Sequence, residues 1–173
     1  NVGDGEKAIS YLRDFKSDIA LIFEPVRSNY IETISTINQP IQAVMSQEHP
    51  LSKFKSINLA DCLKYPLALP PSPYAVREIL ETAAAEESLD LNPTVEAESY
   101  IFLHNFVSRK KNAISFEVEI DVPKQSLDRS ISTVPINLSK SHQGQIHLLK
   151  LQGRTFSGAT EQFLKQLLCV FNK

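Results

Sequence analysis

The sequence predicts an α/β protein in which strands and helices alternate along the chain. Short apolar runs typical of buried strands occur at 18–23, 67–69 and 113–118. Stretches with apolar residues at helical spacing lie at 6–16 and 73–85. Alternation of this kind favours an α/β architecture with mostly parallel sheets.

The first part of the chain is expected to form one helix followed by three strands. The helix carries Ala8, Ile9, Leu12 and Phe15 on one face. Proline ends the first strand after Glu24 and interrupts the β-branched stretch that follows. In order, the expected elements are a helix at 6–16 and strands at 18–23, 30–37 and 41–45.

Polar residues placed before apolar stretches predict three helix starts in the middle of the chain. Asn58 is expected at the N-cap of a short helix, and Ser99 at the N-cap of a longer one. Ser72 is expected to cap a helix whose first residue is Pro73, where a missing N–H is harmless. Besides these helices, at 59–64, from 73 and from 100, strands are expected at 67–69, 94–98, 113–118, 131–136 and 146–151. A polar loop is expected at 121–129 and a turn at 139–144. The chain should close with a helix whose apolar residues are Ala159, Phe163, Leu164, Leu167, Leu168 and Phe171.

Composition excludes several classes of protein. A net charge of −2 on 173 residues argues against a freestanding nucleic-acid binder, which is usually basic. No apolar run approaches the roughly 18 residues of a membrane span. Cys62 and Cys169 each lie in an apolar helical pattern, so both are expected to be buried thiols in a reducing, cytoplasmic setting. The chain begins without Met, which suggests a trimmed segment of a longer protein.

Searches for catalytic and metal-binding patterns return nothing specific. G-x-S-x-G, Walker and G-x-G-x-x-G motifs are absent. His49, His104, His142 and His147 have no metal-ligand spacing with Cys, Asp or Glu. No cofactor is therefore predicted. The remaining signal is a pair of helix N-termini after strands, where N–H groups and partial positive charge suit a small carboxylate.

The order of motifs resembles the effector-sensing domain of LysR-type bacterial transcription regulators. The His-Pro-Leu sequence at His49 and the closing helix that begins near Arg154 carry the most specific likeness. Lys111 and Ala113 replace two glycines of the family pattern. The matching segments are KSDIALI at 16–22, QAVMSQEHPL at 42–51, the short helix and strand at 57–67, the segment at 107–116, and the closing helix at 154–164.

The resemblance implies a type 2 periplasmic-binding-protein-like fold with two α/β lobes and a cleft between them. Residues 1–47 and 140–173 would form the first lobe, and 48–139 the second. The first strand and helix of the first lobe, and the family's winged helix-turn-helix, have no counterpart in this sequence.

The implied function is binding of a small metabolite, a carboxylate or amino-acid-like effector, in the cleft. Binding would shift a homodimer or homotetramer, and DNA would be contacted only through the winged helix-turn-helix. A freestanding solute-binding protein would need a signal peptide, and an enzyme would need an acid/base pair that we cannot assemble. The candidate ligand contacts are Phe23, Glu24 and Pro25 in the first lobe, where Glu24 favours a ligand bearing an amine, and Ser72, Pro73, Tyr74, Ser99, Phe102 and Phe116 in the second.

Overall fold

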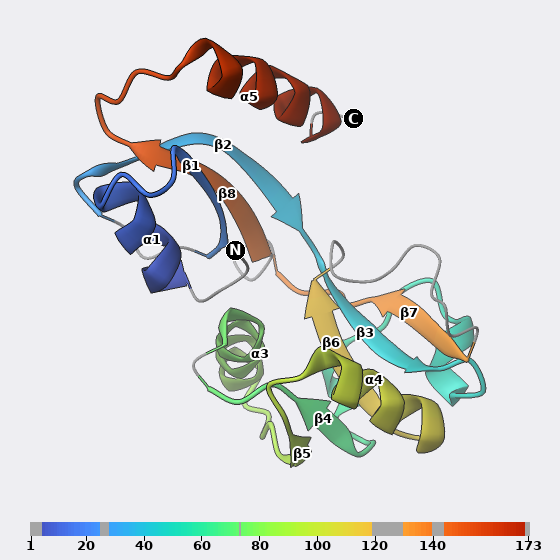
Figure 1. The fold of residues 1–173 in the computed structure, drawn as a ribbon. Helices are drawn as coiled ribbons and strands as arrows, with labels where there is room; N and C mark the ends of the chain where they lie inside the picture. Colours follow the sequence, from blue (N-terminus) through green and yellow to red (C-terminus); the bar gives the residue numbers. More distant parts are fainter. Residues whose placement is uncertain (1–4, 25–27, 73, 119–129, 140–143, 172–173) are drawn as a thin grey trace. The chain divides into compact units, whose positions relative to one another are not determined.

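The computed structural model describes residues 5–24, 28–72, 74–118, 130–139 and 144–171. The chain divides into two compact units (Figure 1). Unit 1 holds Asn1–Asn38 and Gln145–Lys173, and unit 2 holds Gln39–Gly144. The family resemblance implied lobes of 1–47 with 140–173, and of 48–139. The strand at 41–46 accounts for most of the difference, because it hydrogen-bonds to two strands of unit 2.

Unit 1 is a three-stranded sheet with a helix packed against it. The strand order is β1 (Ile19–Phe23), β8 (Gly144–Leu151) and β2 (Ile31–Gln39), with β1 and β8 antiparallel. Helix α1 (Gly5–Arg13) packs on β1. Its predicted apolar face is confirmed, since the unit 1 core consists of Leu12, Ile22 and Leu149, surrounded by Ala8, Ile9, Ala20 and Ile31.

Helix α1 ends at Arg13, earlier than the predicted residue 16. The backbone N–H groups of Lys16 and Ser17 both donate to the carbonyl of Tyr11, at 2.8 and 3.2 Å, which closes the helix. Phe15 takes the left-handed conformation at this end, with φ +59°. Its side chain is 67% exposed and faces the Arg154 guanidinium, 5.0 Å from the ring centroid. Phe15 is therefore not on the apolar helix face that the spacing predicted.

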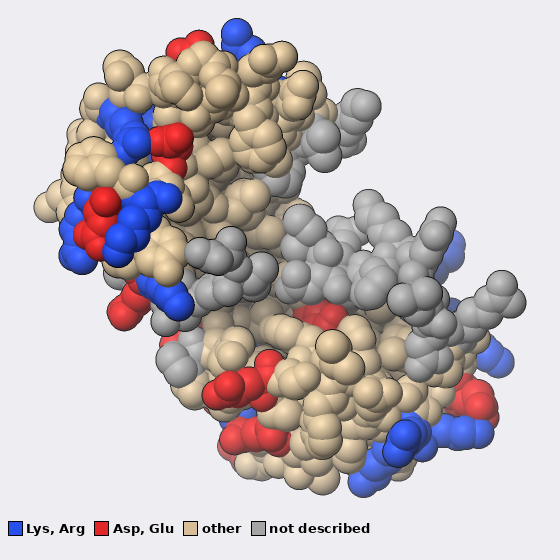
Figure 2. All heavy atoms as spheres, viewed as in Figure 1, with Lys and Arg blue, Asp and Glu red and all other residues tan. Residues whose placement is uncertain are grey.

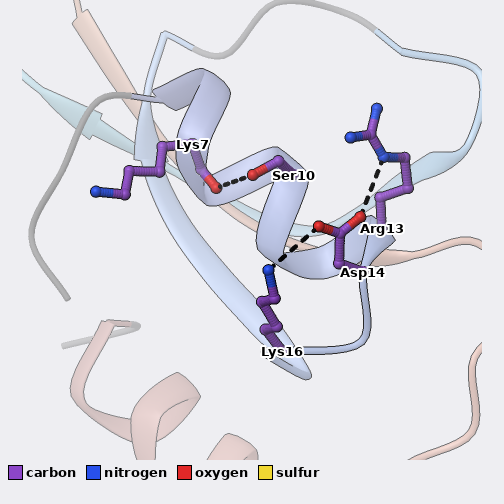
Figure 3. Close-up of polar contacts among 5 residues, drawn as sticks. All are labelled: Lys7, Ser10, Arg13, Asp14 and Lys16. Carbon is purple, nitrogen blue, oxygen red and sulfur yellow. Dashed lines mark hydrogen bonds and ion pairs between the residues drawn. The ribbon is translucent and has the colours of Figure 1, made fainter.

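Charges of both signs alternate at this end of α1 (Figure 3). Asp14 accepts hydrogen bonds from Arg13 Nε at 3.4 Å and Lys16 Nζ at 3.5 Å. All three side chains are well exposed, so these pairs add little stability. In Figure 2, most of the described Lys and Arg groups on the visible face lie near Asp and Glu groups, and they do not gather into one broad basic surface.

The closing helix α5 (Gly158–Phe171) is fixed at its first turn by a polar network. One oxygen of Asp18 binds Arg154, and the other accepts from Thr160 Oγ1 at 3.0 Å. Ser157 Oγ accepts from the Thr160 N–H at 3.3 Å. The network joins the start of β1 to the start of α5.

The apolar side of α5 is less covered than the sequence suggested. None of the described side chains between residues 158 and 169 is buried, and Phe163 is 54% exposed. Cys169 is exposed, so the prediction that both thiols are buried is wrong for this one. Cys62 is fully buried in unit 2, and desolvation, aided by Asp61, raises the pKa of its thiol to about 12.

Unit 2 is built on a five-stranded sheet in the order β5-β4-β6-β3-β7. Strand β4 (Leu67–Leu69) runs parallel to β5 (Pro93–Glu96) and β6 (Ile114–Val118). Strand β3 (Ile41–Ser46) runs antiparallel to β6 and to β7 (Ile131–Pro135). The prediction of mostly parallel sheets is therefore wrong. Among the described residues, helices connect β4 to β5 and β5 to β6, and such crossovers produce parallel neighbours.

Four helices belong to unit 2 among the described residues. The 3-10 helix Pro50–Lys53 and α2 (Leu59–Cys62) lie between β3 and β4. Helix α3 (Ala75–Glu86) connects β4 to β5, and α4 (Tyr100–Arg109) connects β5 to β6. Asn58 stands at the N-cap of α2 as predicted, but its side chain makes no hydrogen bond to the helix.

Helices α3 and α4 cover opposite faces of this sheet. Leu103 of α4 packs in a cluster that includes Val95 of β5. Arg77 of α3 instead donates to Glu96 of β5 at 2.9 Å. Because neighbouring residues of a strand point to opposite faces, Val95 and Glu96 mark the α4 side and the α3 side. Both faces of the sheet are therefore covered.

Burial of Leu103 contributes strongly to the stability of unit 2. Leu103 is 0% exposed, whereas Ile101 on the same helix is 75% exposed. We expect Leu103→Ala to lower the free energy of unfolding by about 3 kcal/mol, from lost apolar burial and the cavity left behind. Ile101→Ala should change it by less than about 0.5 kcal/mol. Urea unfolding of both variants measures the difference, and equal losses would contradict the assignment of α4's buried face.

Candidate functional site

One edge of the unit 2 sheet collects the features that can form a ligand site. Because β4, β5 and β6 are mutually parallel, their carboxyl ends meet at this edge. The chain leaves β4 into α3 and leaves β5 into α4, so both helix N-termini lie there too. Strand β4 sits between β5 and β6, so the two crossovers run in opposite directions. Ligands of open α/β sheets bind at such switch points. We call this region the strand-end edge.

The N-terminus of α4 is formed as the sequence predicted. Ser99 is the N-cap, in extended backbone conformation, and its Oγ accepts from the Phe102 N–H at 3.3 Å. Phe102 is 50% exposed, and its neighbour Ile101 is more exposed still. The first turn of α4 therefore presents apolar side chains to solvent next to the positive end of the helix dipole.

The N-terminus of α3 differs from the prediction. Tyr74, not Ser72, is the N-cap, and the helix begins at Ala75. The Tyr74 side chain is 37% exposed and makes no capping hydrogen bond. Ser72 lies in the preceding turn and is exposed. The prediction that Ser72 caps the helix is wrong, because the first turn forms further along the chain than the Ser-Pro pair implied.

The remaining candidate residues fall into three groups. Phe116 is 0% exposed in β6 and packs in the core of unit 2. Phe23 is half-buried at the end of β1 in unit 1, opposite Ile146 of β8. Pro25 and Pro73, like the predicted loop at 121–129, lie outside the described residues.

Glu24 has a structural role inside unit 1. It takes a left-handed conformation, with φ +45°. Its backbone N–H donates to the Gln145 carbonyl at 2.9 Å, and its Oε1 accepts from the Gln145 N–H at 2.6 Å. The Gln145 side chain in turn donates to Asn38 Oδ1 at 2.9 Å. Asn38 and Gln145 are the residues of unit 1 at which the chain passes to and from unit 2. Glu24 therefore helps, through Gln145, to hold these two crossing points together.

Sequence reasoning missed a set of buried polar residues beneath α4. Gln42, Ser115 and Glu117 are 7%, 0% and 0% exposed. His104 Nε2 of α4 lies 2.5 Å from Glu117 Oε1. The alternation of β6, Ile-Ser-Phe-Glu-Val, suggests a half-exposed strand with its polar residues in water. The structure covers that polar side with α4.

His49 is a structural histidine. It is 1% exposed, and its Nδ1 accepts from the Leu51 N–H at 3.1 Å at the start of the 3-10 helix. The ring packs edge-on against Tyr65, with centroids 4.5 Å apart. Burial lowers the pKa of His49, an effect that a hydrogen bond with the backbone of Asn112 reduces. His49 is therefore held neutral near pH 7.

Neither a metal centre nor a membrane span is found in the part of the chain that the structure describes. There, no three His, Cys, Asp or Glu side chains are grouped so that they could hold a metal ion. None of the described helices combines the length and apolar character needed to cross a bilayer.

Comparison with known proteins identifies the family. A family model described as the LysR substrate binding domain matches residues 1–172. The chain belongs to this family. It is therefore an effector-binding domain of the LysR type, as the motif order suggested. A search of curated proteins finds no match to the chain.

Solved structures of LysR-type regulators share the fold. The effector binding domain of QuiR in complex with shikimate has a TM-score of 0.76 and 24% identity, covering 98% of this chain and 79% of that one. The CcmR regulatory domain from Synechocystis PCC6803, in complex with 2-PG, has a TM-score of 0.80 and 14% identity, covering 99% and 81%.

A longer regulator also contains a region with this fold. HinK, a LysR family transcriptional regulator from Pseudomonas aeruginosa, has a TM-score of 0.77 and 15% identity. The match covers 96% of this chain and 57% of HinK, so the chain spans little more than half of that regulator. The family and these neighbours are regulatory proteins, and the α/β fold class expected from the LysR resemblance is confirmed.

The two serines before α3 and α4 should respond differently to substitution. Ser99→Ala removes a capping hydrogen bond and should lower the free energy of unfolding by about 1 kcal/mol. Ser72→Ala removes no cap and should change it by less than about 0.5 kcal/mol. Denaturant unfolding of the two matched variants tests this, and an equal loss at Ser72 would restore it as a capping residue.

The buried His49 should make stability depend on pH. Below its ordinary pKa of about 6.5, the unfolded chain binds a proton at His49 that the folded chain resists. Stability from this residue is therefore present above pH 6.5 and decreases as pH falls, by at most about 1.4 kcal/mol per pH unit. His49→Asn keeps an acceptor for Leu51 but cannot titrate. Unfolding free energies between pH 7.5 and 5.5 should fall less steeply in this variant, and unchanged slopes would refute the explanation.

Proposed function

We propose that this LysR-type domain binds a small anionic metabolite at the strand-end edge of unit 2. The proposal rests on the topology, which places the N-termini of α3 and α4 at the same edge of the sheet, each with a partly exposed aromatic residue. Tyr74 and Phe102 offer apolar surface, and the two helix N-termini offer N–H groups and partial positive charge. A small carboxylate with an apolar or ring portion, or an amino-acid-like molecule, fits this combination.

Related proteins support this class of ligand. The QuiR domain is solved with shikimate, CcmR with 2-PG, and the effector binding domain of BenM with benzoate. All three matches have the fold of this chain, with TM-scores of 0.76, 0.80 and 0.72. Their ligands are small molecules, as expected for a compact edge site rather than an extended surface.

The residues proposed to contact the ligand are Ser72, Tyr74, Ser99 and Phe102. Ser72 and Tyr74 are exposed at the turn into α3, and Ser99 and Phe102 are exposed at the start of α4. Phe23 and Glu24, which belong to unit 1, stay predicted ligand contacts. The Glu24 carboxylate already accepts a backbone hydrogen bond from Gln145, so an amine would compete with that bond. Phe116 is left out, since its side chain is wholly buried.

Regulation would follow from a difference in affinity between two conformations. A ligand that binds one arrangement of the domain more tightly shifts the population toward it by that difference alone. We propose that the arrangement is read through a homodimer or homotetramer and passed to a winged helix-turn-helix outside this chain. The site residues proposed here have no acid/base pair between them, so the proposed activity is binding rather than catalysis.

A panel of small carboxylates tests the proposal. Shikimate, benzoate, 2-PG and common amino acids would be screened by thermal shift, and a hit measured by calorimetry. A true ligand at about a hundred times its Kd should stabilise the protein by about 2.7 kcal/mol. Phe102→Ala and Ser72→Ala should each weaken binding, the former by about tenfold from lost apolar contact. Arg109→Ala, at the other end of α4, is the control and should bind like the parent. The proposal is wrong if the hit binds both site variants as tightly as it binds the parent.

A further inference from the structure

The polar residues beneath α4 form a layer on one face of the unit 2 sheet. Gln42 is paired with Glu117, and Val44 with Ser115, in the antiparallel register of β3 and β6. Directly opposed residues point to the same face. Val44 packs in the cluster that contains Leu103 of α4. Gln42, Ser115 and Glu117 therefore point toward α4.

Glu117 meets α4 through His104. The two side chains approach to 2.5 Å between Oε1 and Nε2, with Glu117 1% exposed and His104 22% exposed. A carboxylate taken out of water is strongly disfavoured unless an opposite charge or a hydrogen-bond donor compensates it. At this distance a charged imidazolium attracts the carboxylate, whereas a neutral imidazole carries no charge to attract it. The contact is therefore strongest when His104 carries a proton, and its partial exposure gives water access to that proton.

The described residues around this pair come from the strands packed against α4 and from α4 itself. Strands β3 and β4 contribute Val44, Gln42 and Ala68, and β7 contributes Ile131. From α4 itself come Leu103, Val107 and Tyr100. Among these described residues Tyr100 is the other titratable group. Arg77 and Glu96 lie on the opposite face with α3.

We propose that His104 and Glu117 form a proton-dependent latch that holds the first half of α4 on the sheet. His104 lies four residues after Tyr100, so it follows the first helical residue by one turn. It is two residues from Phe102, whose side chain stands at the strand-end edge. Both latch members are positioning residues, since they act on the site through the placement of α4. Any effect of the latch on ligand affinity rests on the proposed function, but the latch itself does not.

The direction of the pH effect follows from the chemistry of the pair. At pH 6 a protonated His104 binds the Glu117 carboxylate as an ion pair. As pH rises, His104 loses its proton, and the buried carboxylate loses the opposite charge beside it. The first half of α4 then opens more readily. His49 acts in the opposite sense, because its neutral form is the one that the fold favours, and it lies before the 3-10 helix rather than on α4.

Amide hydrogen exchange on the whole protein tests the latch without any ligand. After correction for intrinsic exchange, amides at 103–107 should be about tenfold better protected at pH 6 than at pH 8, relative to amides of β3, because local opening of α4 breaks an ion pair that exists only while His104 is protonated. Glu117→Gln should abolish this difference. Glu48→Gln is the matched control, because Glu48 pairs with Lys111 in water, with both side chains more than 60% exposed. It should leave the difference unchanged.

Three outcomes overturn the proposal. The first is that Glu117→Gln keeps the difference in amide protection between pH 6 and pH 8. The second is that the parent protein lacks this difference at 103–107. The third is that the amides of β3 show the same difference. If Glu117→Gln fails to fold, the parent still decides the question by NMR. The His104 ring signal, assigned with His104→Gln, should titrate with the same midpoint as the amide signals of α4, and separate midpoints refute the latch. A negative ligand screen would contradict the proposed function and leave these results intact.

Discussion

The two-sided pairing of β3 constrains the rest of unit 2. All six of its residues are buried, and it hydrogen-bonds to β6 on one side and β7 on the other. A shift of one residue would turn Gln42 and Val44 away from α4 and bring Ala43 and Met45 to face it. The register of β3 therefore decides which side chains lie beneath α4, and with them the setting of Glu117. It also fixes where the chain leaves unit 1, since only Pro40 separates β3 from β2.

Local patterns predicted most elements but not every helix start. Ser99 and Ser72 both precede apolar helical stretches, and only Ser99 caps one. The N-cap is set by where the first turn closes, which depends on packing of α3 against the sheet as well as on the residue before it. Local sequence patterns also could not predict whether neighbouring strands run parallel or antiparallel. The antiparallel run of β3 against β6 is fixed by pairing between residues some 70 positions apart, such as Met45 and Ile114.

Burial was the hardest property to predict for the candidate site. Phe116 and Glu117 are adjacent, and both are fully buried, because α3 and α4 cover the two faces of β6. The sequence could not show that both faces are covered, so Phe116 was expected at a ligand and Glu117 was not considered. Cys169 illustrates the reverse case. Its apolar helical pattern predicted burial, but the described contacts that fix α5 lie at its first turn, and the thiol near its other end is exposed.

The hydrogen bond between Gln145 and Asn38 has a consequence for the modularity of the chain. These two residues flank the whole of unit 2, which is one uninterrupted stretch, whereas unit 1 is assembled from both ends of the sequence. Unit 2 thus has the topology of a domain inserted into a host at neighbouring points, an arrangement that tolerates excision and circular permutation. A gene segment encoding residues 39–144 would carry the strand-end edge and both latch residues together. The two parts of unit 1 could then be joined between Asn38 and Gln145, whose side chains are already hydrogen-bonded to each other.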